Sequence, residues 1–243
     1  MRLLQLLRSI LFTTCFFIST ALYAALVLVA CWALTFSIRW RIARSWALLN
    51  LWLLKMLCNL DYVVEGREHI PADNQVAMWK HSSTWETIAQ AVIFPAQAWV
   101  LKRELLWIPL VGWALHLMHP IAINRSAGGS AVRQVVAQGK ARLKEGIWVV
   151  IFPEGTRAQV GKAGKYGMSG AMLAIESGRK IIPVAHTAGY FWPRRGWLKK
   201  AGTIRVIIGP PIDTQGRETR ELNAQVQGWI ESTINTIAPP QND

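Results

Sequence analysis

The sequence predicts an α/β protein with a mostly parallel or mixed central sheet flanked by helices, preceded by a membrane-embedded helical segment. Two observations lead to this prediction: 30 consecutive uncharged residues from Ser9 to Ile38, and short apolar runs that alternate with helical patterns in the rest of the chain. A chain of 243 residues has room for one globular domain and an additional segment. We therefore expect a membrane anchor over residues 1–60 and a globular domain over residues 61–243.

The uncharged run from Ser9 to Ile38 is long enough to cross a bilayer once. As a helix it measures roughly 45 Å, against a hydrocarbon core of about 30 Å. One tilted span is therefore expected, and a half-buried hairpin is the alternative. The arginines that flank the run are Arg2 and Arg8 before it and Arg39, Arg41 and Arg44 after it. Their slight excess after the run favours a cytoplasmic globular domain, and a hairpin would place both flanks at one surface.

The stretch from Ser45 to Leu60 has apolar side chains at helical spacing, so we expect a helix along the membrane interface. A cleavable signal peptide is disfavoured, because Leu22 and Tyr23 interrupt the small-residue pattern that cleavage requires. Leu28 to Cys31 resembles a lipoprotein cleavage box. It stands late in the chain and is followed by more apolar sequence, which makes cleavage there the less favoured interpretation.

Four apolar runs in the globular part read as short strands, and each is followed by polar side chains. The runs cover residues 75–79, 98–101, 121–123 and 147–152, and the groups that follow them are His81, Lys102, Arg125, and Glu154 to Arg157. Ligands of open α/β sheets bind beyond the carboxyl ends of the strands. We therefore expect these groups to meet in one strongly cationic crevice.

The remaining elements follow from periodicity and end signals. Helices are predicted over residues 130–144, 168–177 and 218–237, and strands over residues 181–185 and 203–208. The stretch from Tyr190 to Lys200 interleaves aromatic and basic side chains. It is interpreted either as a second contact with the membrane surface or as an exposed hairpin loop.

His81 and Glu86 lie five positions apart and have the chemistry of a general base with an orienting carboxylate. A neutral imidazole accepts a proton from a hydroxyl at about pH 7, and a carboxylate behind it fixes the tautomer. Residues five apart on one helix point about 140° away from each other. Both side chains therefore reach one pocket only if His81 precedes the helix that contains Glu86, with Ser83 as its N-cap. In the alternative, Glu86 belongs to a capping box and merely bonds to a backbone N–H group.

These motifs resemble those of the glycerolipid acyltransferases, the family that contains the 1-acylglycerol-3-phosphate acyltransferases. The family's four motifs have counterparts in the same order: His81-x4-Glu86 for HX4D, Lys102 to Leu105 with Ile121 to Arg125 for the second, Phe152 to Arg157 for the third, and Ile181 to Val184 for the fourth. The third match is close, and the ordered set is a strong signal.

The resemblance implies direct acyl transfer from an acyl thioester to the hydroxyl of a lysophospholipid, most simply lysophosphatidic acid giving phosphatidic acid. Coenzyme A or acyl carrier protein leaves, and no cofactor or metal is required. His81 would be the base and Glu86 its orienting group. The implied substrate-binding residues are Lys102, Arg125, Glu154, Gly155, Thr156 and Arg157, of which the three cations would hold the acceptor phosphate.

Two positions depart from the family pattern. Glu86 stands where an aspartate is usual, and Lys80 stands where an asparagine is usual. We expect acceptor choice to be the property most affected. Another lysophospholipid or a non-glycerol acceptor therefore remains open, as do a lipid thioesterase or hydrolase and a noncatalytic basic membrane protein.

The charge balance suits a membrane surface and phosphorylated substrates. The net charge is +13, from 27 basic and 14 acidic side chains. Nucleic acid is a less favoured partner because no nucleic-acid motif is present. All three cysteines lie in the first sixty residues, and His116-x-x-His119 has no carboxylate or thiol near it in sequence, so no metal site is expected. Because acyl thioesters are cytoplasmic, we expect the protein at the cytoplasmic membrane with its catalytic domain facing the cytoplasm.

Overall fold

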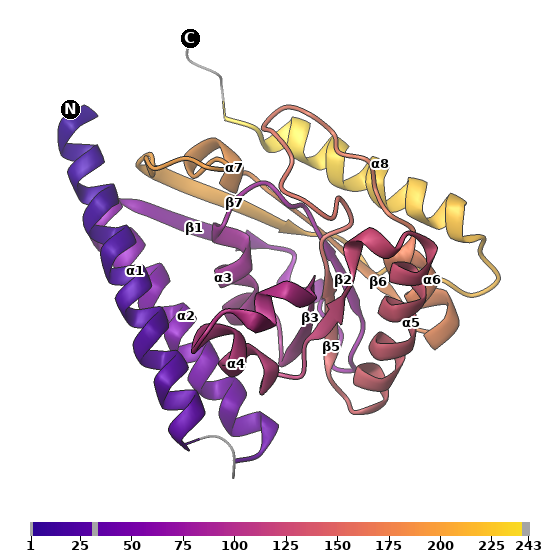
Figure 1. The fold of residues 1–243 in the computed structure, drawn as a ribbon. Coiled ribbons are helices and arrows are strands. Elements are labelled where there is room, and N and C mark those ends of the chain that lie inside the picture. The colour runs from indigo at the N-terminus through magenta and orange to yellow at the C-terminus, as the bar shows by residue number, and fades with distance from the viewer. Residues whose placement is uncertain (1, 31–33, 240–243) are drawn as a thin grey trace.

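The computed structural model describes residues 2–30 and 34–239 and contains one seven-stranded sheet with helices on both faces (Figure 1). The strand order is β1-β7-β6-β2-β5-β3-β4. The strands are β1 (Leu60–Glu65), β2 (Val76–Trp79), β3 (Gln97–Lys102), β4 (Ile121–Ile123), β5 (Trp148–Ile151), β6 (Ile181–His186) and β7 (Gly202–Ile208).

The sheet is mixed. Strands β6, β2, β5, β3 and β4 are parallel neighbours, β7 is antiparallel to β6, and β1 is parallel to β7. The predicted class, a mostly parallel or mixed sheet flanked by helices, is therefore confirmed. Because β2, β5, β3 and β4 run in the same direction, their carboxyl ends lie along one edge, where the predicted polar groups begin.

Helices cover both faces of the sheet. The α-helices are α1 (Arg2–Ala30), α2 (Phe36–Cys58), α3 (Trp85–Ile93), α4 (Val111–His116), α5 (Gly129–Lys144), α6 (Ser169–Ser177), α7 (Ala188–Phe191) and α8 (Thr219–Ile237). Three short 3-10 helices are η1 (Arg67–His69), η2 (Arg103–Trp107) and η3 (Arg125–Ala127).

Alternation along the strands builds two hydrophobic cores. Ala77 and Trp79 of β2 face α2 and α3, whereas Val76 and Met78 face α5, α6 and α8. Successive side chains of a strand point to opposite faces, so a fully buried strand is apolar throughout. This is why the central strands appear in the sequence as unbroken apolar runs.

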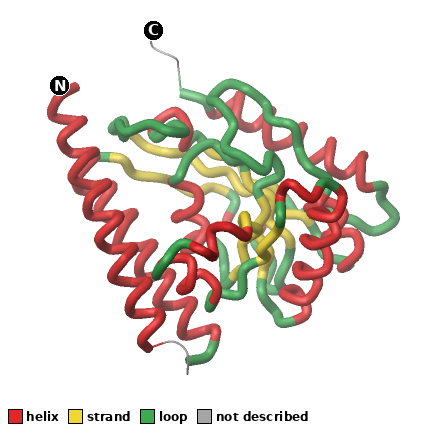
Figure 2. The backbone as a smooth tube through the Cα atoms, viewed as in Figure 1, coloured by secondary structure: helices red, strands yellow, loops and turns green. Residues whose placement is uncertain are grey.

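The N-terminal helices α1 and α2 lie side by side in antiparallel directions along one edge of the molecule (Figure 2). Most of the uncharged run lies in α1, and its last three residues, Phe36 to Ile38, begin α2. Polar contacts join the two helices: Gln5 Nε2 donates to the Cys58 carbonyl at 3.0 Å, and Ser19 Oγ donates to Asn50 Oδ1 at 3.1 Å. Cys31, the last residue of the predicted cleavage box, lies outside the described residues.

Helix α2 starts at Phe36, nine residues before the predicted interfacial helix, and ends at Cys58. Asn59 adopts a left-handed conformation with φ of 52°, which terminates the helix and leads the chain directly into β1. Of the described helices, α1 is the one that is long and apolar enough to cross a membrane, with a mean hydropathy of 2.0 and only 22% of that window buried.

Candidate active site

The side chains of His81 and Glu86 meet, as their spacing predicts when His81 precedes the helix. His81 lies in the turn between β2 and α3, and Glu86 is the second residue of α3. His81 Nδ1 lies 2.9 Å from Glu86 Oε1. Since an ionised carboxylate only accepts hydrogen bonds, we assign the ring proton to Nδ1, which leaves the Nε2 lone pair free.

The same carboxylate oxygen also caps the turn. Glu86 Oε1 accepts the backbone N–H groups of Ser82 at 2.8 Å and Ser83 at 2.7 Å. The orienting and capping interpretations of Glu86 therefore describe one side chain. The predicted N-cap is displaced by one residue: Thr84 occupies that position, and the Ser83 hydroxyl accepts the N–H of Trp85 at 3.1 Å.

Glu86 and His186 are both fully buried behind His81. Burial by itself raises the pKa of Glu86, but the contact with His81 and the Ser83 N–H outweigh it and hold the pKa below its ordinary value. Glu86 is therefore an anion. Its Oε2 lies 3.9 Å from His186 Nε2 and has no hydrogen-bond partner among residues 2–30 and 34–239.

His186 is a neutral support for the turn. Its Nδ1 accepts the Ala188 N–H at 3.2 Å, so Nε2 carries the proton and donates to the Lys80 carbonyl at 2.8 Å. Burial lowers the pKa of His186 below its ordinary value. The sequence motif ending at Val184 thus leads to a buried histidine beneath the base.

One face of the His81 ring stacks on Phe152, with ring centroids 4.2 Å apart and planes inclined by 20°. The His81 side chain is 12% exposed, so its free edge still reaches the cavity described below. Ring stacking and the Glu86 contact together fix the orientation of the imidazole.

Glu154 lies beneath the turn and does not line the cavity. Its carboxylate accepts the backbone N–H of His81 at 3.2 and 3.3 Å, and Lys80 Nζ lies 3.3 Å from it. Burial raises the pKa of Glu154, and the charge of Lys80 partly offsets this. Lys80 also binds Glu231 Oε1 at 2.6 Å, and that oxygen accepts the Tyr166 hydroxyl at 3.0 Å. The residues of this buried cluster support the backbone of the base.

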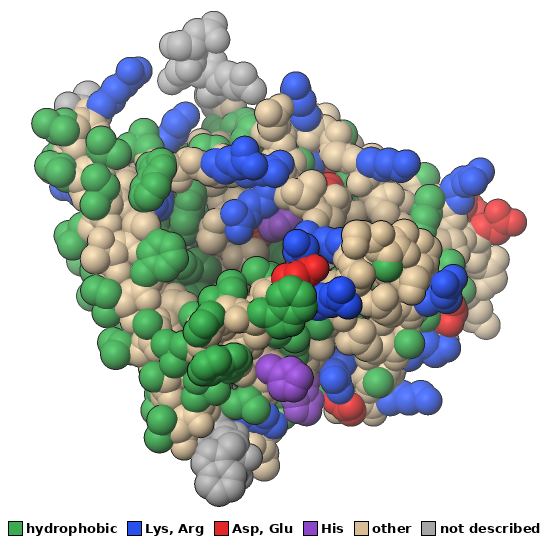
Figure 3. Space-filling view, viewed as in Figure 1, with side chains coloured by type: hydrophobic (Ala, Val, Ile, Leu, Met, Phe, Trp, Pro, Cys, Tyr) green, Lys and Arg blue, Asp and Glu red, His purple; other side chains and the backbone are tan. Residues whose placement is uncertain are grey.

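A cavity of about 620 Å³ opens beside His81, beyond the carboxyl ends of β2 to β5. Its polar end is formed by His81, Lys102, Arg125, Thr156, Arg157 and Arg194. Figure 3 shows lysine and arginine side chains gathered around a hollow on this face. Four of the predicted residues thus line one cavity: Lys102 at the end of β3, Arg125 at the start of η3, and Thr156 and Arg157 in the loop after β5.

The rest of the cavity is apolar. Its walls come from α1, α2, α3, β3 and α4, through residues that include Tyr23, Ala24, Val27, Trp46, Ala91, Trp99, Leu101, Val111, Ala114 and Met118. A single cavity thus joins a cationic mouth to a hydrophobic interior, and His81 lies in its lining.

Gly155 contributes its backbone. Arg125 Nη1 donates to the Gly155 carbonyl at 2.5 Å, which joins the loop after β4 to the loop after β5. Gly155 has φ of 65°, a conformation that glycine adopts without strain. Like Glu154, it shapes the site without lining the cavity.

Two parts of the site could not be predicted from the sequence. Arg194 lines the cavity and donates through Nη1 to the Arg157 carbonyl at 2.9 Å, across 37 residues of sequence. The cavity walls from α1 and α2 are the other part. The basic residues between Tyr190 and Lys200 were the available signal for Arg194, but only the fold shows which of them faces the cavity.

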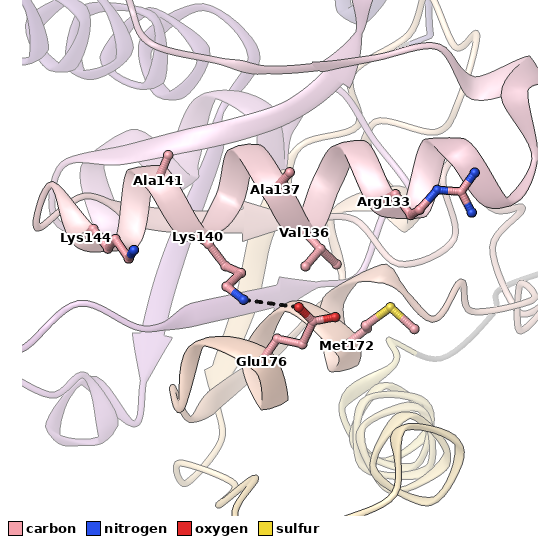
Figure 4. Close-up of a pocket in the computed structure, with 8 residues that line it drawn as sticks. All are labelled: Arg133, Val136, Ala137, Lys140, Ala141, Lys144, Met172 and Glu176. Carbon is pink, nitrogen blue, oxygen red and sulfur yellow. Dashed lines mark hydrogen bonds and ion pairs between the residues drawn. The ribbon is translucent and has the colours of Figure 1, made fainter.

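A second groove, of about 510 Å³, lies between α5 and α6 on the opposite face of the sheet (Figure 4). Its basic rim includes Arg133 and Lys140, and Lys140 Nζ lies 3.2 Å from Glu176 Oε2. None of the predicted site residues borders it.

Comparisons with known proteins agree with this geometry. The acyltransferase family model matches residues 61–187, more than half of the chain. A 1-acyl-sn-glycerol-3-phosphate acyltransferase of Pseudomonas aeruginosa is 40% identical over 99% of this chain and 95% of its own length. The corresponding alpha enzyme of Bos taurus is 27% identical over 77% of this chain and 67% of its own.

The crystal structure of the 1-acyl-sn-glycerophosphate acyltransferase PlsC from Thermotoga maritima has the same fold, with a TM-score of 0.82 and 22% identity over 100% of this chain and 99% of that one. The sequence matches extend through the motifs around His81, Arg125 and Arg157. This chain therefore belongs to the acyltransferase family.

Proposed function

We propose that this protein transfers a fatty acyl group from an acyl thioester to the free hydroxyl of 1-acylglycerol-3-phosphate, giving phosphatidic acid, with His81 as general base. The observation that carries the proposal is the position of the His81–Glu86 pair in a cavity that joins a cationic mouth to an apolar interior. The name of the Pseudomonas aeruginosa relative supports this choice of acceptor.

The proposed reaction is a direct acyl transfer. The unprotonated Nε2 of His81 takes the proton of the acceptor hydroxyl as its oxygen attacks the thioester carbonyl. The tetrahedral intermediate collapses, the ester forms, the carbon–sulfur bond breaks, and the imidazolium returns the proton to the departing thiolate. Glu86 stabilises the imidazolium through its contact with Nδ1.

The acceptor phosphate binds at the cationic mouth. Arg125 and Arg157 offer guanidinium forks that match phosphate oxygens, and Lys102 adds a point charge. Thr156 adds a hydroxyl group at the same place. An acyl chain occupies the apolar interior of the cavity, because removing its apolar surface from water is favourable.

The donor is acyl coenzyme A or acyl carrier protein, used as a co-substrate. No separate cofactor takes part in the proposed steps, since base, orienting group and phosphate site are all side chains of this chain. The mouth is open to solvent on its cationic side, which suits the phosphates that both donors carry.

The protein is proposed to work at the cytoplasmic membrane with its catalytic domain towards the cytoplasm. Large apolar side chains of α1 face outwards, including Leu4, Leu7, Leu11, Phe17, Ile18 and Leu22, and Trp52 and Met56 do so on α2. An exposed apolar surface of this extent, together with a net charge of +13, fits an anionic bilayer. Residues 1–60 are the proposed anchor and residues 61–243 the acyltransferase domain.

The test is an assay of the purified protein with a panel of lysolipids and with labelled acyl coenzyme A and acyl carrier protein. We expect diacyl product to form from 1-acylglycerol-3-phosphate, with one thiol released per ester formed. His81→Ala should reduce turnover by a factor of about 10² to 10⁴. His116→Ala, at an exposed histidine outside the cavity, is the matched control and should retain activity.

Two outcomes would overturn the proposal. Release of free fatty acid without any acceptor would identify a thioesterase. Normal turnover by His81→Ala would exclude His81 as the base.

A further inference from the structure

A row of polar residues interrupts the apolar surface of α1. Gln5, Ser9 and Thr13 follow each other at intervals of four, which places them on one face of the helix. Ser9 is fully buried, although it belongs to a helix with many exposed leucines. This face of α1 contacts the catalytic domain.

The partner of the row is Lys199, which is only 2% exposed. Its backbone N–H donates to Ser9 Oγ at 2.9 Å, and its carbonyl accepts from Gln5 Nε2 at 2.5 Å. Its ammonium group donates to Thr13 Oγ1. Both backbone groups and the side chain of one lysine are thus bound by three successive turns of α1.

Aromatic contacts complete this attachment. Lys199 Nζ lies 5.6 Å from the Phe12 ring centroid and 4.9 Å from that of Trp192. The Phe12 and Trp192 rings pack edge to face with centroids 5.5 Å apart. A buried ammonium group is costly unless its surroundings compensate it, and here two rings and two hydrogen-bond acceptors do so.

The attached segment carries Arg194. Trp192 lies two residues before it and Lys199 five residues after it, so both ends of this short loop are fixed on α1. Arg194 lines the cationic mouth and is tied to the Arg157 carbonyl through Nη1. A guanidinium has five N–H donors, so this bond leaves others for a ligand.

We propose, building on the proposed function, that Arg194 is a further phosphate-binding residue and that Lys199 positions it by fastening its loop to α1. Arg194 comes from the segment between α7 and β7 and lies next to Arg157 of the loop after β5. Affinity for the acceptor phosphate then depends on how α1 is seated on the domain.

The first test compares Arg194→Ala with Arg195→Asn, a neighbouring exposed arginine that does not line the cavity. Asparagine suits this control because Arg195 has φ of 60°. Arg194→Ala should raise about tenfold both the KM for 1-acylglycerol-3-phosphate and the inhibition constant of glycerol 3-phosphate. The KM of the thioester and all constants of Arg195→Asn should stay as in the wild type.

An unchanged inhibition constant for glycerol 3-phosphate would remove Arg194 from the phosphate site. Equal increases in the KM of acceptor and thioester would indicate a structural role instead. Wild-type protein that fails to acylate 1-acylglycerol-3-phosphate would refute the proposed function itself, whereas active wild type with an unaffected Arg194→Ala would refute only the present inference.

The second test is a double-mutant cycle with Lys199→Met, controlled by Lys200→Met at the exposed neighbouring lysine. We expect Lys199→Met to raise the acceptor KM and to speed trypsin cleavage after Arg194 and Arg195. The double variant should be no worse than the more affected single variant, because both remove the same contribution. Fully multiplicative effects would show that Lys199 does not act through Arg194. If Lys199→Met does not fold, Thr13→Val replaces it in the cycle, since it removes one hydrogen bond and leaves the lysine in place.

Discussion

At the scale of single residues, one oxygen atom carries much of the site. Glu86 Oε1 accepts the imidazole N–H of His81 and two backbone N–H groups of the preceding turn. The carboxylate therefore fixes the ring and the backbone that bears it. A buried anion with three donors is stable, because each hydrogen bond to a charged group is worth about 1.5–3 kcal/mol.

Replacing Glu86 separates its electrostatic role from its capping role. Glu86→Gln keeps an oxygen for the Ser82 and Ser83 N–H groups but loses the charge that stabilises the imidazolium. We expect turnover to fall by a factor of about 10² or more. Glu86→Asp keeps the charge on a shorter stem and should be less impaired. Steady-state kinetics with a thermal unfolding control measure both, and small, equal effects would leave Glu86 as a cap alone.

The buried His186 predicts how stability depends on pH. Burial lowers its pKa in the folded state, while the unfolded chain titrates near the ordinary value of 6.5. The unfolded state therefore binds a proton first as pH falls. The stabilising contribution of neutral His186 is fully present above pH 6.5 and is lost as the pH falls towards the pKa of His186 in the folded state.

The urea concentration at the unfolding midpoint should be measured at about pH 8, 6.5 and 5.5. As the pH falls, this midpoint should decline more steeply for the wild type than for His186→Gln. His116→Gln, at an exposed position, should follow the wild-type slope. Parallel slopes for wild type and His186→Gln would mean that this imidazole does not titrate on unfolding.

At the scale of elements, burial decides what the sequence reveals. Strands β2 and β5 are buried on both faces, so their apolar runs predict them within two residues. Strand β1 was not predicted, since it alternates half-buried and exposed positions, carries Asp61 and Glu65, and pairs with β7 far along the chain. Strand order was not predictable for the same reason.

The end of α1 and the start of α2 could not be located from the sequence, because no glycine, proline or charged residue stands between Ser9 and Ile38. The sequence predicted those site residues that belong to sequence motifs. His81, Glu86, Arg125 and Arg157 belong to local patterns, whereas Arg194 belongs to none and is brought to the cavity by the fold.

The close approach of α4 to η2 can be tested by replacing a glycine with alanine. A Cβ added at Gly112 would lie 2.5 Å from the Leu105 carbonyl oxygen, a backbone atom that cannot move alone. Gly112→Ala should lower the free energy of unfolding by about 1–3 kcal/mol. It should also reduce activity, because Leu105 lines the cavity.

Gly228→Ala on α8 is the contrasting variant, since no atom lies within 4 Å of its added Cβ. Its free energy of unfolding should rise by up to about 1 kcal/mol from helix propensity. Chemical denaturation measures both variants. Equal effects would show that η2 and α4 are not packed as described.

At the scale of the whole molecule, α1 has two different faces. Its polar row and the residues next to α2 contact the protein, while its remaining surface is exposed and apolar. The helix is therefore a packed layer of the fold as well as the proposed contact with lipid. Its attachment through Gln5, Ser9 and Thr13 holds it against the domain along its first half.

Vesicle partitioning tests this division. Ile18, 55% exposed on α1, contributes about 1.5–3 kcal/mol when its side chain leaves water. Ile18→Glu should weaken partitioning into anionic vesicles about tenfold or more in a sedimentation assay. Gln225→Glu, the same charge change on the exposed side of α8, should have little effect. Equal binding by both variants would move the lipid contact away from α1.

The helical hairpin also supplies part of the wall around the acyl cavity, through Tyr23, Ala24 and Val27 of α1 and Trp46 of α2. A truncated version that starts at β1 would be an obvious route to a water-soluble enzyme. It would lack this wall, and the acyl cavity would be open to solvent on that side. A soluble variant should instead keep α1 and α2 and replace only their exposed apolar side chains with charged ones.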